Sequence, residues 1–210
     1  DESWGPRYDP GISVIHWDGI NEDGTYTTRP WTAPANDVEK YWETGTTWAN
    51  SIAISKSGPA YGVRFAYKNT MVDGTMPNSE QGKNDFKLAS DFNIAENLTI
   101  NGSLNYVRTD TKGRPELGYS SESVGQKFFQ WGQRQLDYER LKEYKTSTGE
   151  QRTWNRISLF NPTPKYSDNP YWTAFENYPD DLRNRLLGNI SLSWEIVDDL
   201  VLKGSVYQDY

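Results

Sequence analysis

Apolar and polar residues alternate along the chain with a period of two in six short segments. These segments are residues 50–55, 60–69, 85–94, 98–108, 185–196 and 200–210. In the fourth segment Leu98, Ile100, Leu104 and Tyr106 share one face, and Thr99, Asn101, Ser103 and Asn105 share the other. This period is typical of β-strands and differs from the 3.6-residue period of a helix. The pattern predicts an all-β fold of about six antiparallel strands.

The segments that connect these strands alternate between short and long. The short ones are "SKSGP", "AEN" and "VDD", whereas residues 1–47, 70–82 and 110–184 are long. All the long connectors then fall at one end of the sheet, as in outer-membrane barrels, which have short periplasmic turns and long extracellular loops. On this basis residues 1–47 form an extracellular loop and 48–109 four barrel strands. Residues 110–184 form a second long extracellular loop, and 185–210 two further strands.

The turn of one hairpin is repeated in another. "FNIAENLTINGSL" and "WEIVDDLVLKGSV" match at the turn, and they place Phe92 and Trp194 at the same position on the apolar face. An aromatic residue that recurs there fits a girdle at a membrane interface. The alternative is two ordinary hairpins with packed aromatic rings.

Charged residues occupy the opposite face of the predicted strands. They are Arg64, Lys68, Lys87, Asp91, Glu195 and Lys203. A dry core excludes such residues, so we expect this face to contact water, either at a soluble surface or in a wide lumen. Eight strands are the practical minimum for a membrane barrel. The pattern also stops in mid-strand at Tyr210, so we expect the chain to be part of a longer protein.

The second long connector contains the one strong helical pattern, "SESVGQKFFQWGQRQLDYERLKEYK". Val124, Phe128, Trp131, Tyr138 and Leu141 fall on a helical stripe. Ser123 and Gln126 have the spacing of a capping box at its start. We therefore predict a helix near residues 122–145, which would give this loop a folded lid or docking surface.

Composition narrows the functional classes. Mean hydropathy is −0.87, and no run approaches the ~18 apolar residues of a membrane helix, but membrane strands escape such scans. The net charge of −7 disfavours nucleic-acid binding, because no basic stripe is present. Without cysteine there is no disulfide framework or zinc finger. The single histidine, His16, has no partner histidine, and we expect no metal site and no cofactor.

No catalytic motif is present, and no pair of carboxylates is singled out by its spacing, so we expect the chain not to be an enzyme. Sequons at Asn97, Asn101 and Asn189 allow a glycosylated loop, but each lies in an alternating segment, which favours small polar residues on one face of a strand.

Aromatic residues make up 14% of the chain and many of them lie in the long connectors. The most notable are Trp4, Trp31, Trp131, Trp154, Tyr171 and Trp172. Three roles are open: packing the loops against one another, contacting a protein lid, or stacking on a bound ligand. Trp131 lies on the helical stripe, which favours packing.

Several stretches, in order, resemble the SusC/RagA-type TonB-dependent outer-membrane transporters. They are "DESWGPRYDP", "NDVEKYWETGTTWANSIAIS", "MPNSE", "FFQWGQRQLDYERLKEY" and "NPYWTAFENYPDDLRNRLLGNISLSWEIVDDLVLKG". The resemblance implies an N-proximal part of a 22-stranded transmembrane β-barrel in the outer membrane of a Gram-negative bacterium. It further implies import of oligosaccharides or peptides, a SusD-like surface lipoprotein, and energy from TonB–ExbB–ExbD. The plug and TonB box are not among these residues, so the resemblance alone implies energy coupling.

Two other functions remain open. One is a soluble extracellular β-sandwich that binds carbohydrate through exposed aromatic rings. The other is an outer-membrane component of a different assembly built on the same barrel. The alternation of connector lengths favours the importer over the soluble sandwich, but it does not separate the importer from another assembly built on the same barrel.

Overall fold

A computed structural model describes the structure of residues 5–210 of the protein. Its internal contacts divide it into two compact units, which are described separately. The loop unit comprises Asp1–Gly45, Gly74–Ser79 and Lys112–Pro179, and the sheet unit comprises Thr46–Asp73, Glu80–Thr111 and Asp180–Tyr210.

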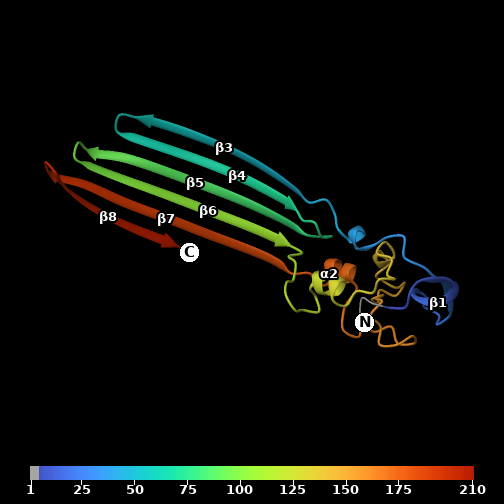
Figure 1. Cartoon of the computed structure of the whole chain (residues 1–210). Helices are drawn as coiled ribbons and strands as arrows, with labels where there is room; N and C mark the ends of the chain where they lie inside the picture. The colour runs from blue at the N-terminus through green and yellow to red at the C-terminus, as the bar shows by residue number, and fades with distance from the viewer. Residues whose placement is uncertain (1–4) are drawn as a thin grey trace. The chain divides into compact units, whose positions relative to one another are not determined.

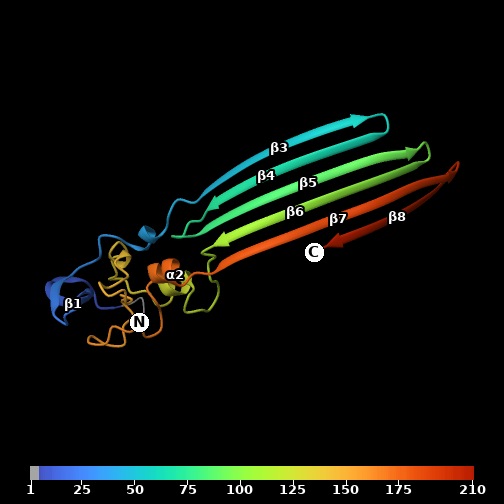
Figure 2. The ribbon, with the colours of Figure 1, turned by 180° about the vertical axis from the view of Figure 1, so that it is seen from behind.

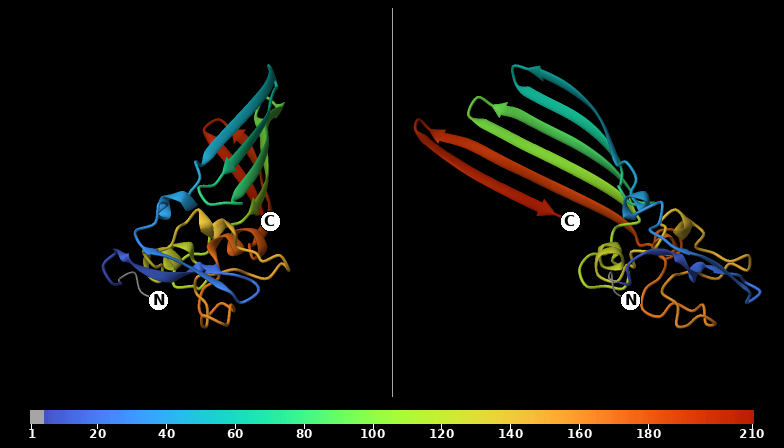
Figure 3. Two further views of the ribbon diagram at one scale, coloured as in Figure 1. Left: turned by 90° about the vertical axis from the view of Figure 1, so that its right-hand side faces the viewer. Right: turned by 45° about the vertical axis from the view of Figure 1, so that its right-hand side comes forward.

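The sheet unit is a single layer of six strands. They are β3 (Thr46–Gly58), β4 (Tyr61–Asp73), β5 (Glu80–Ala95), β6 (Leu98–Lys112), β7 (Asp180–Val197) and β8 (Leu200–Asp209). Their order in the sheet is their order in the sequence, with β3 and β8 at the edges (Figure 1). The open sheet is seen from behind in Figure 2, and its twist is visible in Figure 3. The predicted antiparallel β-structure is confirmed.

Tight turns join the strands in three hairpins at one end of the sheet (Figure 1). Gly58 pairs with Tyr61 across the first hairpin, and Val197 pairs with Leu200 across the third. The third turn contains a left-handed residue, Asp199 at φ 65°, and a register shift lies just before the turn, between Glu195 and Val197. Short polar residues such as Asp tolerate this conformation better than most. The repeated sequences thus both form hairpins with two-residue connections, β5–β6 and β7–β8.

The loop unit contains a second, two-stranded antiparallel sheet that the sequence did not predict. Strands β1 (Asp9–Ile20) and β2 (Tyr26–Trp31) lie within residues 1–47, the segment expected to be an extracellular loop, and that expectation included no strands. Between them Gly24 adopts φ 82°, and the Asp23 carboxylate accepts a hydrogen bond of 2.9 Å from the Thr25 N–H. Register shifts interrupt the pairing, which explains why no clean alternation marks these strands.

The predicted helix over residues 122–145 is also wrong in extent. Helix α1 covers only Val124–Phe129, and the 3₁₀ turn η2 (Arg140–Lys142) follows separately. At Gly132 a Cβ atom would lie 2.5 Å from the carbonyl oxygen of Phe128, so the chain folds back at a point that only glycine fits. Ser123 is the N-cap as predicted, since its Oγ accepts a 3.4 Å hydrogen bond from the Gln126 N–H. The capping box is incomplete, because Oε1 of Gln126 has no partner.

The core of the loop unit is aromatic. The 3₁₀ turn η1 (Val38–Tyr41) and helix α2 (Pro170–Glu176) also contribute to it. Its buried members are Tyr41, Val124, Phe128, Leu136, Tyr138, Leu141, Trp154 and Tyr171. The ring of Tyr41 makes edge-to-face contacts with Phe128 at 4.9 Å and with Tyr171 at 5.1 Å. Burial raises the pKa of Tyr138 and of Tyr171 to about 12, so both phenols stay neutral.

Candidate functional site

One face of the sheet unit is apolar, and no element of that unit covers it. Register pairs align Ile52 with Tyr67 and Phe86, and Ile54 with Phe65 and Leu88. The same face continues on β7 and β8, where Ile190 pairs with Val206 and Trp194 pairs with Leu202. The well-exposed apolar side chains on this face are Ile52, Ile54, Phe65, Phe86, Leu88, Phe92, Ile94, Leu104, Leu186, Ile190, Leu192, Trp194, Leu202 and Val206.

Aromatic rings form a row across the middle strands of this face. Tyr67 stacks on Phe86 with ring centroids 4.7 Å apart, and Phe86 stacks on Tyr106 at 6.2 Å. The two hydroxyl groups point toward the end of the sheet away from the hairpin turns. There the Tyr67 hydroxyl donates to Oδ1 of Asn84 at 2.7 Å, and the Tyr106 hydroxyl donates to Oδ1 of Asn184 at 2.8 Å.

A row of asparagines crosses the apolar face next to this aromatic row. Asn50, Asn69 and Asn84 are register partners on β3, β4 and β5. Nδ2 of Asn69 donates to Oδ1 of Asn84 at 3.1 Å. The apolar part of this face therefore ends at the level of the asparagine row, where amide and phenol groups take the place of apolar side chains. A second aromatic level lies near the hairpin turns, where Tyr61 pairs with Phe92.

The opposite face carries the six charged residues predicted to contact water. Arg64 pairs with Ser55 and Ala89, and Lys68 pairs with Ser51 and Asp85. Lys87 and Asp91 lie on the same face of β5, and Glu195 and Lys203 on that of β7 and β8. Between β6 and β7 this face is joined by a hydrogen bond from the Ser103 hydroxyl to Oδ1 of Asn189. The structure thus brings all six residues to one side, as the sequence predicts; their place in a lumen stays a prediction.

The predicted ligand or lid aromatics have different surroundings. Trp154 and Tyr171 are buried in the core of the loop unit, and their Nε1 and hydroxyl groups have no hydrogen-bond partner. Trp31 is half-buried, and its Nε1 donates to the carbonyl oxygen of Arg7 at 3.1 Å. The ring of Trp172 is 6.3 Å from that of Tyr144. All four contact other parts of the loop unit, and Trp4 lies outside the described residues.

A different set of aromatic rings lines a cavity of the loop unit. This cavity, of about 460 Å³, lies between the β1–β2 hairpin and residues 146–162. Trp17, Tyr26 and Phe160 contribute rings to its wall, and Arg152 and Arg156 contribute guanidinium groups. Sequence reasoning missed these residues, because the hairpin that presents Trp17 and Tyr26 was not predicted.

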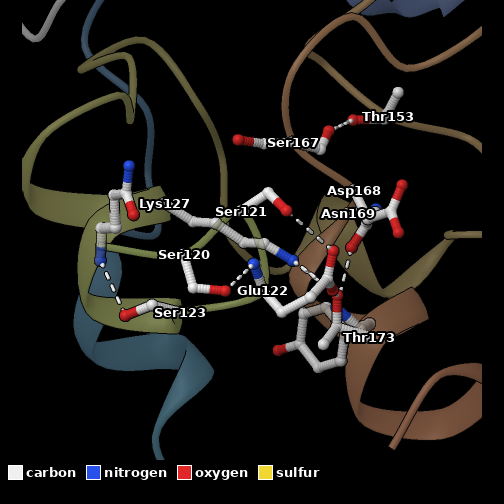
Figure 4. Close-up of polar contacts among 12 residues, drawn as sticks. Ser120, Ser121, Glu122, Ser123, Lys127, Thr153, Ser167, Asp168, Asn169 and Thr173 are labelled. Carbon is white, nitrogen blue, oxygen red and sulfur yellow. Dashed lines mark hydrogen bonds and ion pairs between the residues drawn. The ribbon is translucent and has the colours of Figure 1, made fainter. Parts of the chain in front are cut away.

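A buried lysine, Lys127, forms a polar cluster with Glu122 and Thr173 in the loop unit (Figure 4). The side chain of Lys127, on α1, is fully buried, and its Nζ donates to Oγ1 of Thr173, on α2, at 2.5 Å. Nζ also lies 3.5 Å from Oε2 of Glu122, which accepts a 2.9 Å hydrogen bond from the Thr173 hydroxyl. Burial lowers the pKa of Lys127, and the charges of Glu122 and Asp168 partly oppose this shift. The triad fastens α1 to α2.

Glu122 and Thr173 also line a cavity of about 400 Å³, together with Tyr41 and Tyr178. The ammonium group of Lys127 does not line that cavity, so it is not placed to meet a ligand there. The simplest role for the triad is structural.

One buried asparagine, Asn169, connects several segments of the loop unit by hydrogen bonds. Asn169 is fully buried and caps α2, where its Oδ1 accepts from the Tyr171 N–H at 2.9 Å. Its Nδ2 donates to the carbonyl oxygens of Leu141 and Arg152, each at 2.9 Å. Because Pro170 follows as the first residue of α2, the cap and the start of the helix are fixed by sequence.

A buried carboxylate joins the β1–β2 hairpin to the rest of the loop unit. Asp18 accepts two hydrogen bonds of 2.8 Å from Arg29 and one of 2.7 Å from Arg140. Its side chain is only 3% exposed. Burial alone would raise the pKa of Asp18, but the two guanidinium groups together outweigh burial and lower it.

Among residues 5–210 no group of three or more His, Asp or Glu side chains is arranged to hold a metal ion. None of the helices in this part of the chain has the length and apolar character needed to cross a membrane. No protein-family model and no curated protein matches the chain.

Proposed function

We propose that this chain forms part of a TonB-dependent outer-membrane importer of the SusC/RagA type, which carries oligosaccharides or peptides into the periplasm. The observation that supports the proposal most strongly is the two-faced single-layer sheet with an uncovered apolar side. Soluble monomers rarely expose a contiguous apolar patch larger than a few hundred Å². The six strands would be part of a large transmembrane barrel, with the apolar face toward lipid and Arg64, Lys68 and their neighbours toward a water-filled lumen.

The dimensions of the apolar face support this placement. On β5 the face runs from the level of Asn84 to Ile94 near the turn. That distance is about 33 Å at ~3.3 Å per residue, and at a tilt of about 40° it spans roughly 25 Å, the height of the apolar band of such barrels. The Tyr67–Phe86–Tyr106 row and the asparagine row would then mark the outer interface, and Phe92 and Trp194 the inner one.

The apolar face also has a depression lined by apolar side chains. Gly102 and Gly188 leave a shallow depression of about 370 Å³, lined on its sides by Leu88, Leu104 and Ile190. A soluble β-sandwich would instead need a second sheet packed about 10 Å away on this face. The other sheet of the described residues, β1–β2, has two strands and belongs to the loop unit. No observation specifically favours the sandwich.

The remaining parts of the importer follow from the resemblance. The loop unit would face the cell exterior and meet a SusD-like lipoprotein, while TonB–ExbB–ExbD would act on parts of the protein outside this chain. No chemistry is assigned to the chain itself, and no cofactor is required.

The membrane placement is tested with single-cysteine reporters, since the chain has no cysteine of its own. Leu88→Cys on the apolar face and Lys87→Cys on the opposite face are introduced into the full-length protein in outer-membrane vesicles. We expect a membrane-impermeant maleimide to label Lys87→Cys and to spare Leu88→Cys until detergent is added. Equal labelling of both positions in intact vesicles would contradict a lipid-facing apolar side.

The import claim is tested separately by uptake. Cells that carry the intact gene should accumulate a fluorescent oligosaccharide or peptide, and a protonophore or loss of TonB should abolish the accumulation. Uptake that is unchanged after deletion of the gene, across a panel of both substrate classes, would overturn the proposal.

A further inference from the structure

The cavity between the β1–β2 hairpin and residues 146–162 has aromatic walls that remain accessible. Phe160 is 82% exposed and Tyr26 is 56% exposed, so much of each ring is not covered by other side chains. The volume of about 460 Å³ falls within the range of ligand sites, roughly 300–1,000 Å³. Flat rings in a cavity of this size suit a ligand with an apolar ring face.

Two guanidinium groups on the same wall differ in their partners. Nη1 of Arg152 donates to Oε2 of Glu143 at 3.2 Å, and its guanidinium carbon lies 6.0 Å from the ring of Trp17. Arg156 has no carboxylate partner among residues 5–210. Its Nη2 donates only to the carbonyl oxygen of Leu159, at 3.2 Å, and its Nε is buried without a partner.

Among residues 5–210 no carboxylate therefore compensates the charge of Arg156. Burial lowers the pKa of Arg156, and the neighbouring charge of Arg152 lowers it further. A half-buried guanidinium without a carboxylate is unfavourable, and an anion that arrives with a ligand relieves this cost.

Two carboxylates also line the cavity, and neither pairs with Arg156. Glu22 accepts hydrogen bonds from the backbone N–H and the hydroxyl of Ser147, and these hydrogen bonds lower its pKa. The side chain of Glu150 is exposed. The wall of the cavity thus carries one cation, Arg156, that is left for a ligand.

We propose that this cavity binds an acidic sugar residue, with its ring against Phe160 and Tyr26 and its carboxylate on Arg156. The proposal rests on the importer function and narrows its substrate class to glycans that contain uronic acid. A sugar fits better than a peptide because the aromatic faces are broad and open, and they match the C–H face of a pyranose ring. The preference for an acid comes from Arg156.

The proposal is tested by isothermal titration calorimetry on the full-length protein in detergent. The probes are trigalacturonate, its neutral counterpart galactotriose, and triaspartate as a peptide of equal charge. We expect trigalacturonate to bind at least ten times more tightly than the other two. Arg156→Gln should weaken trigalacturonate binding by about 10- to 100-fold, because a hydrogen bond to a charged group is lost, and should leave galactotriose unaffected.

Control variants separate charge from folding. Arg156→Lys should retain part of the affinity for trigalacturonate that Arg156→Gln loses. Phe160→Ala should weaken the binding of both trigalacturonate and galactotriose. Arg134→Gln removes an exposed arginine that pairs with Asp37 and does not line the cavity, so it should change neither affinity. Equal binding of the acidic and neutral sugars, tighter binding of triaspartate, or no binding of any probe would each overturn the proposal. The calorimetric assay measures binding and not transport, so these outcomes do not decide whether the protein imports its ligand. The uptake experiment tests that separately.

Discussion

A substitution at Ile190 tests directly whether the apolar face contacts lipid or water. Ile190 is 64% exposed in the structure and pairs with Val206 across β7–β8. It precedes Trp194 by about four residues, or roughly 10 Å along the membrane normal at ~3.3 Å per residue and a tilt of about 40°. This places it near the middle of a band about 25 Å high.

The substitution Ile190→Arg has very different costs in lipid and in water. An arginine at the middle of the lipid face of a barrel destabilises the fold by about 2–4 kcal/mol. That range is a change of roughly 30- to 700-fold in the folding equilibrium. A substitution on a water-exposed surface changes stability by only about 0.5 kcal/mol in either direction.

The neighbouring residue provides the matched control. Ser191 pairs with Ser205 on the opposite face, where an arginine should be tolerated within about 0.5 kcal/mol. Both variants of the full-length protein are folded into phospholipid vesicles, and tryptophan fluorescence follows unfolding in guanidinium chloride. Equal destabilisation by the two substitutions, or a larger effect of Ser191→Arg, would refute the assignment of the faces.

Three further predictions concern the loop unit and use chemical unfolding of the full-length protein. Asp18→Asn should cost about 2–4 kcal/mol at pH 7, because three charge-assisted hydrogen bonds are lost while the arginines regain some water. The lowered pKa of Asp18 means that its contribution is present above about pH 4 and is lost as the pH falls further, so variant and wild type should converge there. Lys127→Met should be at least as stable as wild type at pH 7. The lowered pKa of Lys127 means that stability of the wild type rises toward pH 10, so any advantage of the variant should shrink with increasing pH. Gly113→Ala should cost more than the ~1–2 kcal/mol of a left-handed backbone, because its Cβ would lie 2.1 Å from a carbonyl oxygen, whereas Gly118→Ala, with φ 77° and open space, should cost only that amount. An unchanged stability of Asp18→Asn at pH 7, a Lys127→Met variant that loses stability at neutral pH, or equal costs at the two glycines would contradict the respective argument.

The strands were predictable because each depends on local alternation. From Tyr61 to Tyr67 every second residue is apolar or aromatic, and the tight turn between β3 and β4 lies directly before Tyr61. Register then follows from the turns, and it brings Arg64 and Lys87 to one face without any knowledge of tertiary contacts. The bounds were less predictable: β7 begins at Asp180, before its apolar alternation becomes regular.

The loop unit was predicted less well, because its structure depends on contacts between distant segments. Four of the five residues on the apolar stripe that suggested one long helix are buried, and Trp131 is half-buried, but Gly132 breaks the helix after α1. The Asp23–Gly24 pair is a hairpin signal that identifies β1–β2 in retrospect. The cavity had no local signal, since Trp17 and Phe160 meet only when the hairpin docks against residues 146–162. The burial of Lys127 likewise depends on a partner from α2.

The two units are interleaved along the chain, and this has a consequence for the order in which they are completed. Each strand from β3 to β6 pairs with a sequence neighbour, so those hairpins close short loops and need no distant part of the chain. The loop unit instead needs ion pairs and hydrogen bonds between residues more than a hundred positions apart, such as Asp18 with Arg140 and Glu22 with Ser147. The β1–β2 hairpin therefore precedes β3–β6 in the chain, but it can dock only when Arg140 and Ser147, which follow those four strands, are in place.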